Sequence, residues 1–187
     1  MIEVELKYRL DDPESLLSSL VARGAQPKAA TVERDVYFNH PSRDFAVTDE
    51  ALRLRWDGSA AVLTYKGQLL DRVSKSREEL ELDLAGQPAL ETARRILTLL
   101  GFREVRDVEK RRTKFPILHQ GMMVLVTIDE VAGLGLFAEL EAAAERDAYE
   151  AVRDQLIELA AALGLERSER RSYLQLLLES EGGSSRS

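Results

Sequence analysis

The chain begins with the stretch Glu3-Val4-Glu5-Leu6-Lys7, in which charged and apolar residues alternate. Successive side chains of a β-strand point to opposite faces. The alternation therefore predicts a strand with Glu3, Glu5 and Lys7 on one face and Val4 and Leu6 on the other. One face would carry anions and a cation side by side, and the apolar face would need cover from other parts of the chain.

The same alternation recurs in three later stretches. Arg53-Leu54-Arg55, Glu79-Leu80-Glu81 and Glu139-Leu140-Glu141 each repeat one charge on one strand face. Like charges in such a row repel each other unless opposite charges or bound ions lie near them. A polar face in water would explain any single strand of this kind. Several of them together predict one shared, highly charged cavity.

Period-two patterns predict eight strands, at about 2–9, 33–39, 51–57, 60–66, 75–84, 105–115, 122–130 and 136–143. Helical patterns predict helices from Pro13 to a stop at Gly24, from Pro88 to Gly101, over 147–163 and over 169–179. This order predicts an α+β fold with mainly antiparallel pairing. Because helices can cover the apolar faces from outside, the charged faces are expected to line a water-filled barrel or tunnel.

Length and composition limit the classes of protein to consider. A chain of 187 residues predicts a single domain over 1–180, followed by a disordered tail over 181–187. The net charge of −7 argues against a general nucleic-acid binder. The absence of cysteine excludes disulfides, thiolate metal sites and a cysteine nucleophile. Without a long apolar run or a signal segment, we expect a cytoplasmic protein with no membrane contact.

If the charged faces converge, the cavity gathers residues of both signs. The cations are Lys7, Arg53, Arg55, Lys66, Lys110 and Arg112, and the acids are Glu3, Glu5, Glu79, Glu81, Asp129, Glu139 and Glu141. Carboxylate oxygens suit Mg²⁺ or Mn²⁺, whereas guanidinium and ammonium groups suit phosphate oxygens. The pattern therefore predicts a nucleoside triphosphate or another triphosphate, bound with a divalent metal. Arg77 and Lys114 share the strand phase of this cavity, but they fit rim or surface charges equally well.

Other functional motifs are weak or absent. No G-x-x-x-x-G-K-[ST] loop occurs, and Gly133-Leu134-Gly135 is too short for a dinucleotide fingerprint. His40 and His119 lie in turn-like stretches. We expect both histidines at the surface rather than as ligands of zinc, which normally needs three close protein ligands in a catalytic site.

Several motifs resemble one known family. Glu3-Val4-Glu5-Leu6-Lys7 resembles the E-x-E-x-K signature of the CYTH superfamily, which joins class IV adenylyl cyclases and thiamine triphosphatase with inorganic triphosphatases. The stretches that resemble the cyclase branch are 35–43, 48–55, 64–67, 75–79, 129–141 and 172–177. They follow the expected order and span nearly the whole chain.

The resemblance implies an eight-stranded antiparallel triphosphate tunnel and assigns roles within it. It implies that Mg²⁺ or Mn²⁺ is held by Glu3, Glu5, Asp129, Glu139 and Glu141. The phosphate chain is held by Lys7, Arg53, Arg55, Lys66, Lys110 and Arg112. Glu79 and Glu81 position cations or orient the basic residues. Homodimers are common in the cyclase branch, so we also expect a homodimer.

Two reactions fit this cavity, and a third interpretation stays open. The first is that of a class IV adenylyl cyclase, which converts ATP to cyclic AMP and pyrophosphate. The alternative is hydrolysis of thiamine triphosphate, inorganic triphosphate or a nucleotide, for which Lys7 beside Tyr37 is a candidate base for the attacking water. Tyr37 fits a packing and hydrogen-bonding role as well. The third interpretation is a noncatalytic module that binds nucleotides or polyphosphate.

Overall fold

The computed structural model describes residues 2–70 and 73–184, and its chain divides into two compact units. Unit 1 comprises Met1–Ala30, Leu70–Ser76 and Arg111–Arg170. Unit 2 comprises Thr31–Leu69, Arg77–Lys110 and Arg171–Ser187. Each unit is assembled from three separate segments of sequence. The single domain expected over 1–180 stays a prediction.

Eight strands form a sheet whose hydrogen-bonded order closes on itself as β1-β5-β4-β3-β2-β6-β7-β8. The strands are β1 (Ile2–Arg9), β2 (Thr31–Asn39), β3 (Ala51–Trp56), β4 (Ala61–Lys66), β5 (Arg77–Leu84), β6 (Arg103–His119), β7 (Met122–Val131) and β8 (Gly135–Ala144). Neighbours within each unit, such as β1 and β8 or β3 and β4, pair antiparallel. The predicted fold class, an α+β fold built on an eight-stranded antiparallel barrel with helices outside, is confirmed.

Five helices accompany the strands. They are α1 (Pro13–Ala22), α2 (Phe45–Thr48), α3 (Gly86–Leu99), α4 (Tyr149–Ala162) and α5 (Tyr173–Ser184). The short α2 was not predicted. The last helix begins later than the predicted 169 because the Ser172 hydroxyl accepts the backbone N–H of Gln175 and caps it. It continues to Ser184, so it is longer than predicted and takes in part of the expected tail. Residues 185–187 lie outside the described residues.

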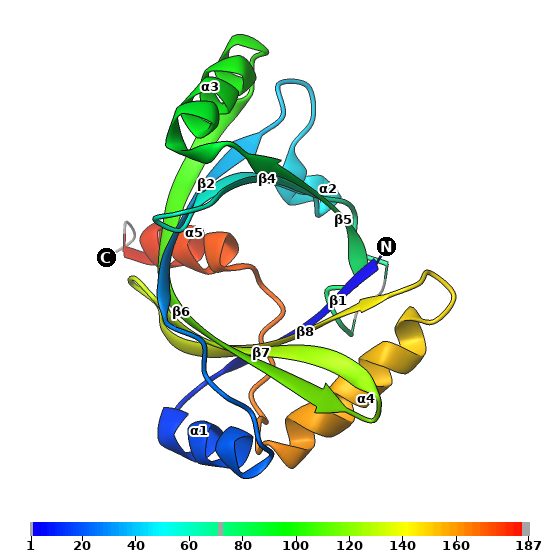
Figure 1. The fold of residues 1–187 in the computed structure, drawn as a ribbon. Coiled ribbons are helices and arrows are strands. Elements are labelled where there is room, and N and C mark those ends of the chain that lie inside the picture. The colour runs from blue at the N-terminus through cyan, green and yellow to red at the C-terminus, as the bar shows by residue number, and fades with distance from the viewer. Residues whose placement is uncertain (1, 71–72, 185–187) are drawn as a thin grey trace. The chain divides into compact units, whose positions relative to one another are not determined.

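In unit 1, the apolar face of β1 forms the core with two helices. The side chains of Val4 and Leu6 pack in one buried cluster with Leu16 and Leu20 of α1 and with Leu156 of α4. The ribbon shows α4 running along β8 and β1 (Figure 1). Burial of each such leucine contributes about 1.5–3 kcal/mol. Because the apolar face of β1 is committed to the helices, Glu3, Glu5 and Lys7 are left on the opposite face.

In unit 2, α3 covers the apolar face of β3 and β4. Leu90 and Leu97 of α3 belong to a buried cluster with Leu52, Leu54 and Phe38. Gly101 follows the helix at φ 89°, a conformation that favours glycine, and so allows the chain to turn into β6. The charged residues of β3 again fall on the face away from the helix.

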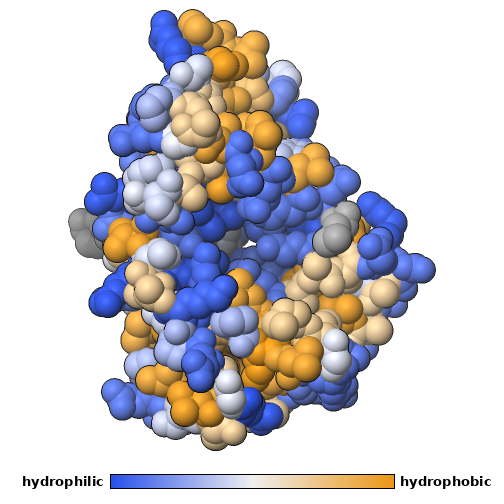
Figure 2. Space-filling view, in the orientation of Figure 1, coloured by the Kyte–Doolittle hydropathy of each residue, from blue (hydrophilic) through white to orange (hydrophobic). Residues whose placement is uncertain are grey.

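Part of α3 presents apolar side chains to the surface. Apolar residues gather over this helix in Figure 2. Ile96 and Leu99 of the helix, and Leu100 directly after it, are exposed. The expected homodimer stays a prediction.

Across the described ranges 2–70 and 73–184, no helix has both the length and the apolar character needed to cross a bilayer. The cytoplasmic location stays a prediction.

Candidate metal centre and phosphate-binding clusters

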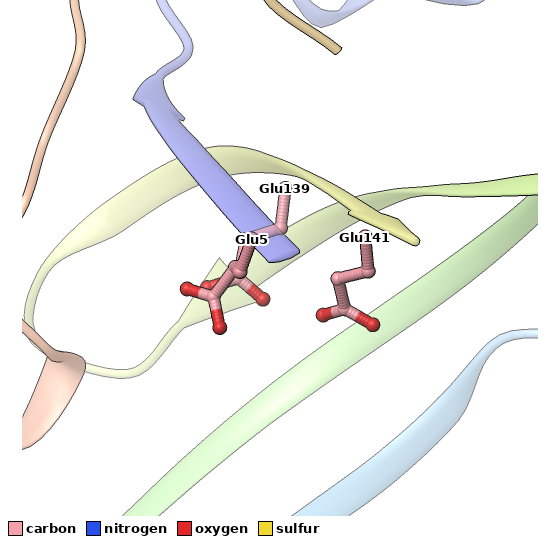
Figure 3. A group of neighbouring side chains, drawn as sticks. All are labelled: Glu5, Glu139 and Glu141. Atoms are coloured by element: carbon pink, nitrogen blue, oxygen red, sulfur yellow. The ribbon is translucent and has the colours of Figure 1, made fainter. Parts of the chain in front are cut away.

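Three carboxylates of unit 1 come together on the charged faces of β1 and β8. Each of Glu5, Glu139 and Glu141 offers an oxygen, and these oxygens all lie within 4.8 Å of one another. Figure 3 shows the three neighbouring side chains, Glu5 from β1 and the other two from β8. Hard oxygen donors at this spacing fit Mg²⁺ or Mn²⁺.

The strand register forces like charges together in this group. Glu5 stands directly opposite Glu141, and Lys7 stands opposite Glu139. A pair of carboxylates in direct cross-strand register is destabilising unless a cation lies between them. Burial raises the pKa of Glu141 to about 8, and the charges of Glu3, Glu139 and Glu5 act in the same direction, while Arg112 opposes them. The positive charge of Arg112 is therefore too little to offset the effect of burial and of the neighbouring carboxylates on ionised Glu141.

Arg112 of β6 is the cation at the centre of the unit 1 cluster. Its guanidinium donates to both oxygens of Asp129, with Nε–Oδ1 at 2.7 Å and Nη2–Oδ2 at 2.5 Å. It also donates to Glu139 and lies 3.4 Å from Glu141 Oε1. Burial tends to lower the pKa of Arg112, but the three carboxylates outweigh it and hold the pKa well above its ordinary value. Arg112 therefore stays charged and neutralises the acids around it.

Two lysines lie beside the same carboxylates. Lys75 Nζ is 2.8 Å from Glu5 Oε1, and the backbone N–H of Lys75 donates to the Glu5 carbonyl oxygen. Lys7 Nζ is 3.9 Å from Glu139 Oε1. Burial lowers the pKa of Lys7 well below its ordinary value, and the neighbouring Lys75 ammonium lowers it further, against the opposite effects of Glu139 and Glu5. Of the two lysines, Lys75 is the better held as a cation.

Thr127 supplies an independent test of whether this centre fits a ligand. It stands opposite Glu139 in the β7–β8 register and is fully buried, with 0% of its surface exposed. Among the described residues, its hydroxyl oxygen has no hydrogen-bond partner. A buried polar group left in that state costs about 1–3 kcal/mol. The carboxylate set and this hydroxyl together fit a hydrated divalent ion.

Thr127→Val should separate ligand binding from folding. Valine has the same shape without the hydroxyl, so we expect the free energy of unfolding to stay the same or to rise by about 1 kcal/mol. If the hydroxyl holds a water or ligand at the centre, the affinity for Mn²⁺ should fall roughly 10-fold. Calorimetric titration and urea denaturation measure the two quantities, and Thr127→Ser, which keeps the hydroxyl, is the control. An unchanged Mn²⁺ affinity in Thr127→Val would remove Thr127 from the site.

Unit 2 carries a second charged cluster, centred on Asp35 of β2. Both Asp35 and Glu33 are only 1% exposed. Arg55 forms a two-pronged contact with Asp35 at 2.6 and 2.7 Å, and Lys110 Nζ lies 3.1 Å from Glu33 and 3.3 Å from Asp35. Burial acts to raise the pKa of Asp35, but Lys110 and the nearby arginines, Arg55 among them, hold it well below its ordinary value. Asp35 is therefore an anion that fixes the cations around it.

The other cations of unit 2 lie around Glu79. Lys66 Nζ is 2.5 Å from Glu79 Oε2, and Arg53 Nη2 is 3.8 Å from Glu79 Oε1. Tyr37 stands opposite Arg53 in the β2–β3 register, so the two side chains lie on the same face. Glu79 thus pairs with two basic side chains, and its supporting role stays a prediction. Glu81 is exposed and accepts a hydrogen bond from the Thr64 hydroxyl.

The structure brings together most of the predicted site residues within each unit. In unit 1 these are Glu5, Lys7, Arg112, Asp129, Glu139 and Glu141, and in unit 2 they are Tyr37, Arg53, Arg55, Lys66, Glu79 and Lys110. Glu3 is half-buried and outside the three-carboxylate group, and Asp129 meets that group through Arg112. A common lumen for both clusters, and a Lys7–Tyr37 pair across the two units, stay predictions.

Neither histidine belongs to the acidic group. His40 and His119 are half-buried rather than on the surface. The His40 ring packs against Phe45 and Phe102, because it lies in the turn between β2 and α2.

Lys75, Glu33 and Asp35 are charged residues of these clusters that were not among the predicted site residues. A signal was present for each. Lys75 shares the odd-numbered phase of Arg77 and Glu79, and Glu33 and Asp35 share the phase of Tyr37. Periodicity predicts which face of a strand a side chain occupies, but not which charged residue it pairs with. It therefore could not distinguish these three residues from charged residues exposed to solvent.

Comparison with known proteins adds a family to this geometry. The model of the CYTH domain matches residues 1–173. The chain belongs to the CYTH family. The predicted resemblance is thereby confirmed.

The CYTH relatives include proteins from archaea and bacteria. "Putative adenylate cyclase MJ0240" of Methanocaldococcus jannaschii is 36% identical over 179 residues, which cover 94% of this chain and 98% of the relative. "Adenylate cyclase CyaB" of Aeromonas hydrophila is 31% identical over 186 residues, covering 95% and 90%. The structure of the PH1819 protein from Pyrococcus horikoshii OT3 is 37% identical, with a TM-score of 0.84 and coverage of 95% and 99%.

A more distant structure shares the fold alone. It is HpAC1 from Hippeastrum, 20% identical with a TM-score of 0.67 and coverage of 95% and 96%. It is described as an adenylyl cyclase that "reveals a dominant triphophatase activity".

Proposed function

We propose that this CYTH protein is a metal-dependent enzyme that acts on a triphosphate, and that its reaction is that of a class IV adenylyl cyclase. The observation that carries the proposal is the carboxylate group of Glu5, Glu139 and Glu141, with Glu5 directly opposite Glu141. Like charges in register are destabilising unless positive charge lies near them, and a bound divalent ion would add to the charge that Lys75 and Arg112 already supply. The names of the M. jannaschii and A. hydrophila relatives support the cyclase assignment.

The metal would be Mg²⁺ or Mn²⁺, held in unit 1. We propose Glu5, Glu139 and Glu141 as its ligands, with Glu3 and Asp129 as the further acidic residues of the centre. When bound, such an ion supplies positive charge that lowers the pKa of a bound hydroxyl and neutralises phosphate oxygens. Arg112 and Lys75 fix the carboxylate orientations, because each donates directly to one of them or to a neighbour.

The phosphate chain would be bound by the basic residues. We propose Arg53, Arg55, Lys66 and Lys110 of unit 2 for this role, together with Lys7 and Arg112 of unit 1. Forked guanidinium groups match pairs of phosphate oxygens, and each ammonium adds a point charge. Glu33, Asp35 and Glu79 hold the unit 2 cations in place before any substrate arrives. Such preorganisation is what electrostatic stabilisation of a transition state requires.

In the cyclase reaction, the 3′-oxygen of ATP forms a bond to the α-phosphorus. The bond from the α-phosphorus to the bridging oxygen of the β-phosphate breaks, and pyrophosphate leaves with that electron pair. The hydroxyl proton passes to a base, and cyclic AMP is the second product. The basic residues stabilise the charge that builds on the leaving pyrophosphate.

Hydrolysis of a triphosphate is the second candidate function, and the reported triphosphatase activity of Hippeastrum HpAC1 favours it. Here the oxygen of water forms a bond to the terminal phosphorus, and the bond from that phosphorus to the bridging oxygen breaks. The diphosphate part of the substrate leaves with that electron pair, the proton of water passes to a base, and orthophosphate is the second product. The attacking water needs a base, for which we propose Lys7 with Tyr37. The pKa of Lys7 is lowered by burial, as a neutral amine base requires.

A product screen tests these functions directly. Purified protein is incubated with ATP, GTP, thiamine triphosphate or inorganic triphosphate, each with Mg²⁺, Mn²⁺ or EDTA, from neutral to alkaline pH. We expect cyclic AMP and pyrophosphate from ATP with metal, and no turnover in EDTA. Phosphate release without a cyclic product would favour the hydrolase. Tight triphosphate binding without turnover of any substrate would favour a noncatalytic module.

Metal binding should release a proton from Glu141. A carboxyl group whose pKa is raised to about 8 is mostly protonated at pH 7, and an ion can bind only its ionised form. The apparent Mn²⁺ affinity should therefore fall by up to about 10-fold for each pH unit below 8 and level off above it. Calorimetry in buffers of different ionisation enthalpy counts the released protons. Glu141→Gln should abolish this release, and a pH-independent affinity in the wild type would contradict the assignment.

The expected homodimer and cytoplasmic location are also proposals for this chain. Light scattering after size-exclusion chromatography measures the first, with a mass near twice the 21.0 kDa of one chain expected.

A further inference from the structure

Arg77 is a buried cation at the start of β5. Only 9% of its surface is exposed. It precedes Glu79 by two residues, so the two side chains leave the strand on the same face. This is the face on which Glu79 holds Lys66 and Arg53 in unit 2. Arg77 thus adds a further basic side chain to the face that carries Lys66 and Arg53.

Arg77 differs from the other basic residues of this cluster in its partners. Arg53, Arg55, Lys66 and Lys110 each have a carboxylate oxygen within 4 Å. Among the described residues, no carboxylate pairs with Arg77. Within the described ranges, its one hydrogen bond runs from Nη1 to the backbone carbonyl oxygen of Asp49 at 3.2 Å, and its Nε has no partner.

The Arg77 guanidinium therefore lacks a negatively charged partner and acceptors for most of its N–H groups. It stays protonated in proteins and offers five N–H donors. A buried charge without an ion-pair partner is strongly unfavourable, and one carbonyl oxygen supplies no net negative charge. The positive charge is also in excess nearby, since Arg53, Arg55, Lys66, Arg77 and Lys110 face the four acids Glu33, Asp35, Glu79 and Glu81. An anion from outside the protein satisfies both deficits.

We infer that Arg77 is a substrate-binding residue whose free N–H donors take a phosphate group of the triphosphate chain. This inference rests on the proposed function and adds a contact to it. The Asp49 carbonyl holds one end of the guanidinium, so the Nε edge is oriented before the ligand arrives. Inorganic triphosphate is the simplest probe, because it presents the phosphate groups without a base or sugar.

Calorimetric titration with inorganic triphosphate in EDTA tests the inference without any catalysis. Arg77→Met should weaken triphosphate binding roughly 10- to 100-fold relative to wild type. Arg77→Lys should fall between the two, because an ammonium keeps the charge but lacks the fork. Arg95→Met is the matched control: Arg95 is an exposed arginine of α3 in the same unit, and its loss should leave the affinity unchanged.

Thermal unfolding of the same variants separates a binding role from a structural one. Because Arg77 has no carboxylate partner, Arg77→Met should keep or raise the melting temperature of the ligand-free protein. Arg55→Met should lower it, since that change removes one of the cations that pair with Glu33 and Asp35. Should Arg77→Met not fold, Arg77→Lys decides: weaker triphosphate binding supports the inference, and unchanged binding overturns it.

The outcomes distinguish this inference from the proposed function. Wild-type affinity in Arg77→Met would overturn the role of Arg77, even if the enzyme turns over a triphosphate. Weakened binding in Arg77→Met, together with no turnover by the wild type, would support the role of Arg77 and contradict the enzyme. A wild-type protein that binds triphosphate neither in EDTA nor with Mn²⁺ would overturn both.

Discussion

Glu5→Gln and Glu141→Gln should each lower metal-dependent turnover by roughly 10³-fold or more. Each change replaces a carboxylate of the candidate metal centre by a neutral amide of the same shape, so the charge that attracts the ion is lost. The fold should be retained, because glutamine keeps the shape of glutamate and still offers an oxygen acceptor to Lys75 or Arg112. Circular dichroism checks the fold, and the product assay and Mn²⁺ titration check the function.

Glu130→Gln is the matched control for these variants. Glu130 lies on β7 in the same unit, but its side chain is exposed. It should keep wild-type turnover and Mn²⁺ affinity. Normal activity in both Glu5→Gln and Glu141→Gln would show that these carboxylates do not hold a catalytic ion.

Arg112→Met should cause the largest loss of stability, about 3–5 kcal/mol in the free energy of unfolding. The guanidinium contacts Asp129, Glu139 and Glu141, all of which are left without this cation when it is removed. Mn²⁺ should restore part of the loss, because a divalent ion can neutralise the same carboxylates. Urea denaturation with and without Mn²⁺ measures both effects.

Arg111→Met provides the comparison for Arg112. The two residues are neighbours on β6, but Arg111 is exposed and points to the other face. Its replacement should change the stability little. Equal losses in the two variants, or a loss below about 1 kcal/mol in Arg112→Met, would contradict the central role given to Arg112.

The secondary structure was largely predictable from periodicity. All eight strands were expected, because alternation such as that of β1 survives wherever one face is covered by helices. The ends were less predictable. β6 extends to His119 although the pattern indicated an end near 115, and α5 begins after the Ser172 cap rather than at 169. Caps and the lengths of neighbouring strands set these limits, and neither is visible in the spacing of apolar residues.

The candidate site was predictable as a set of residues but not as a set of pairs. Strand phase put Glu5, Glu139 and Glu141 on charged faces, and the family resemblance suggested a metal for them. Strand phase could not decide whether Arg77 lies in the cavity or at the surface. Burial with no carboxylate partner, which only the folded chain reveals, is what distinguishes Arg77 from Arg53 and Lys66.

The sequence by itself determined which face of each strand is charged, because alternation in a strand is a local property of the backbone. It also determined the family, through motifs spread over residues 1–173. The tertiary structure decided which charges meet: Glu5 with Glu141 and Lys75, Arg112 with three acids, and Arg77 with none among the described residues. These contacts depend on strand register and on long-range pairing, which join residues far apart in the chain, and no local pattern encodes them.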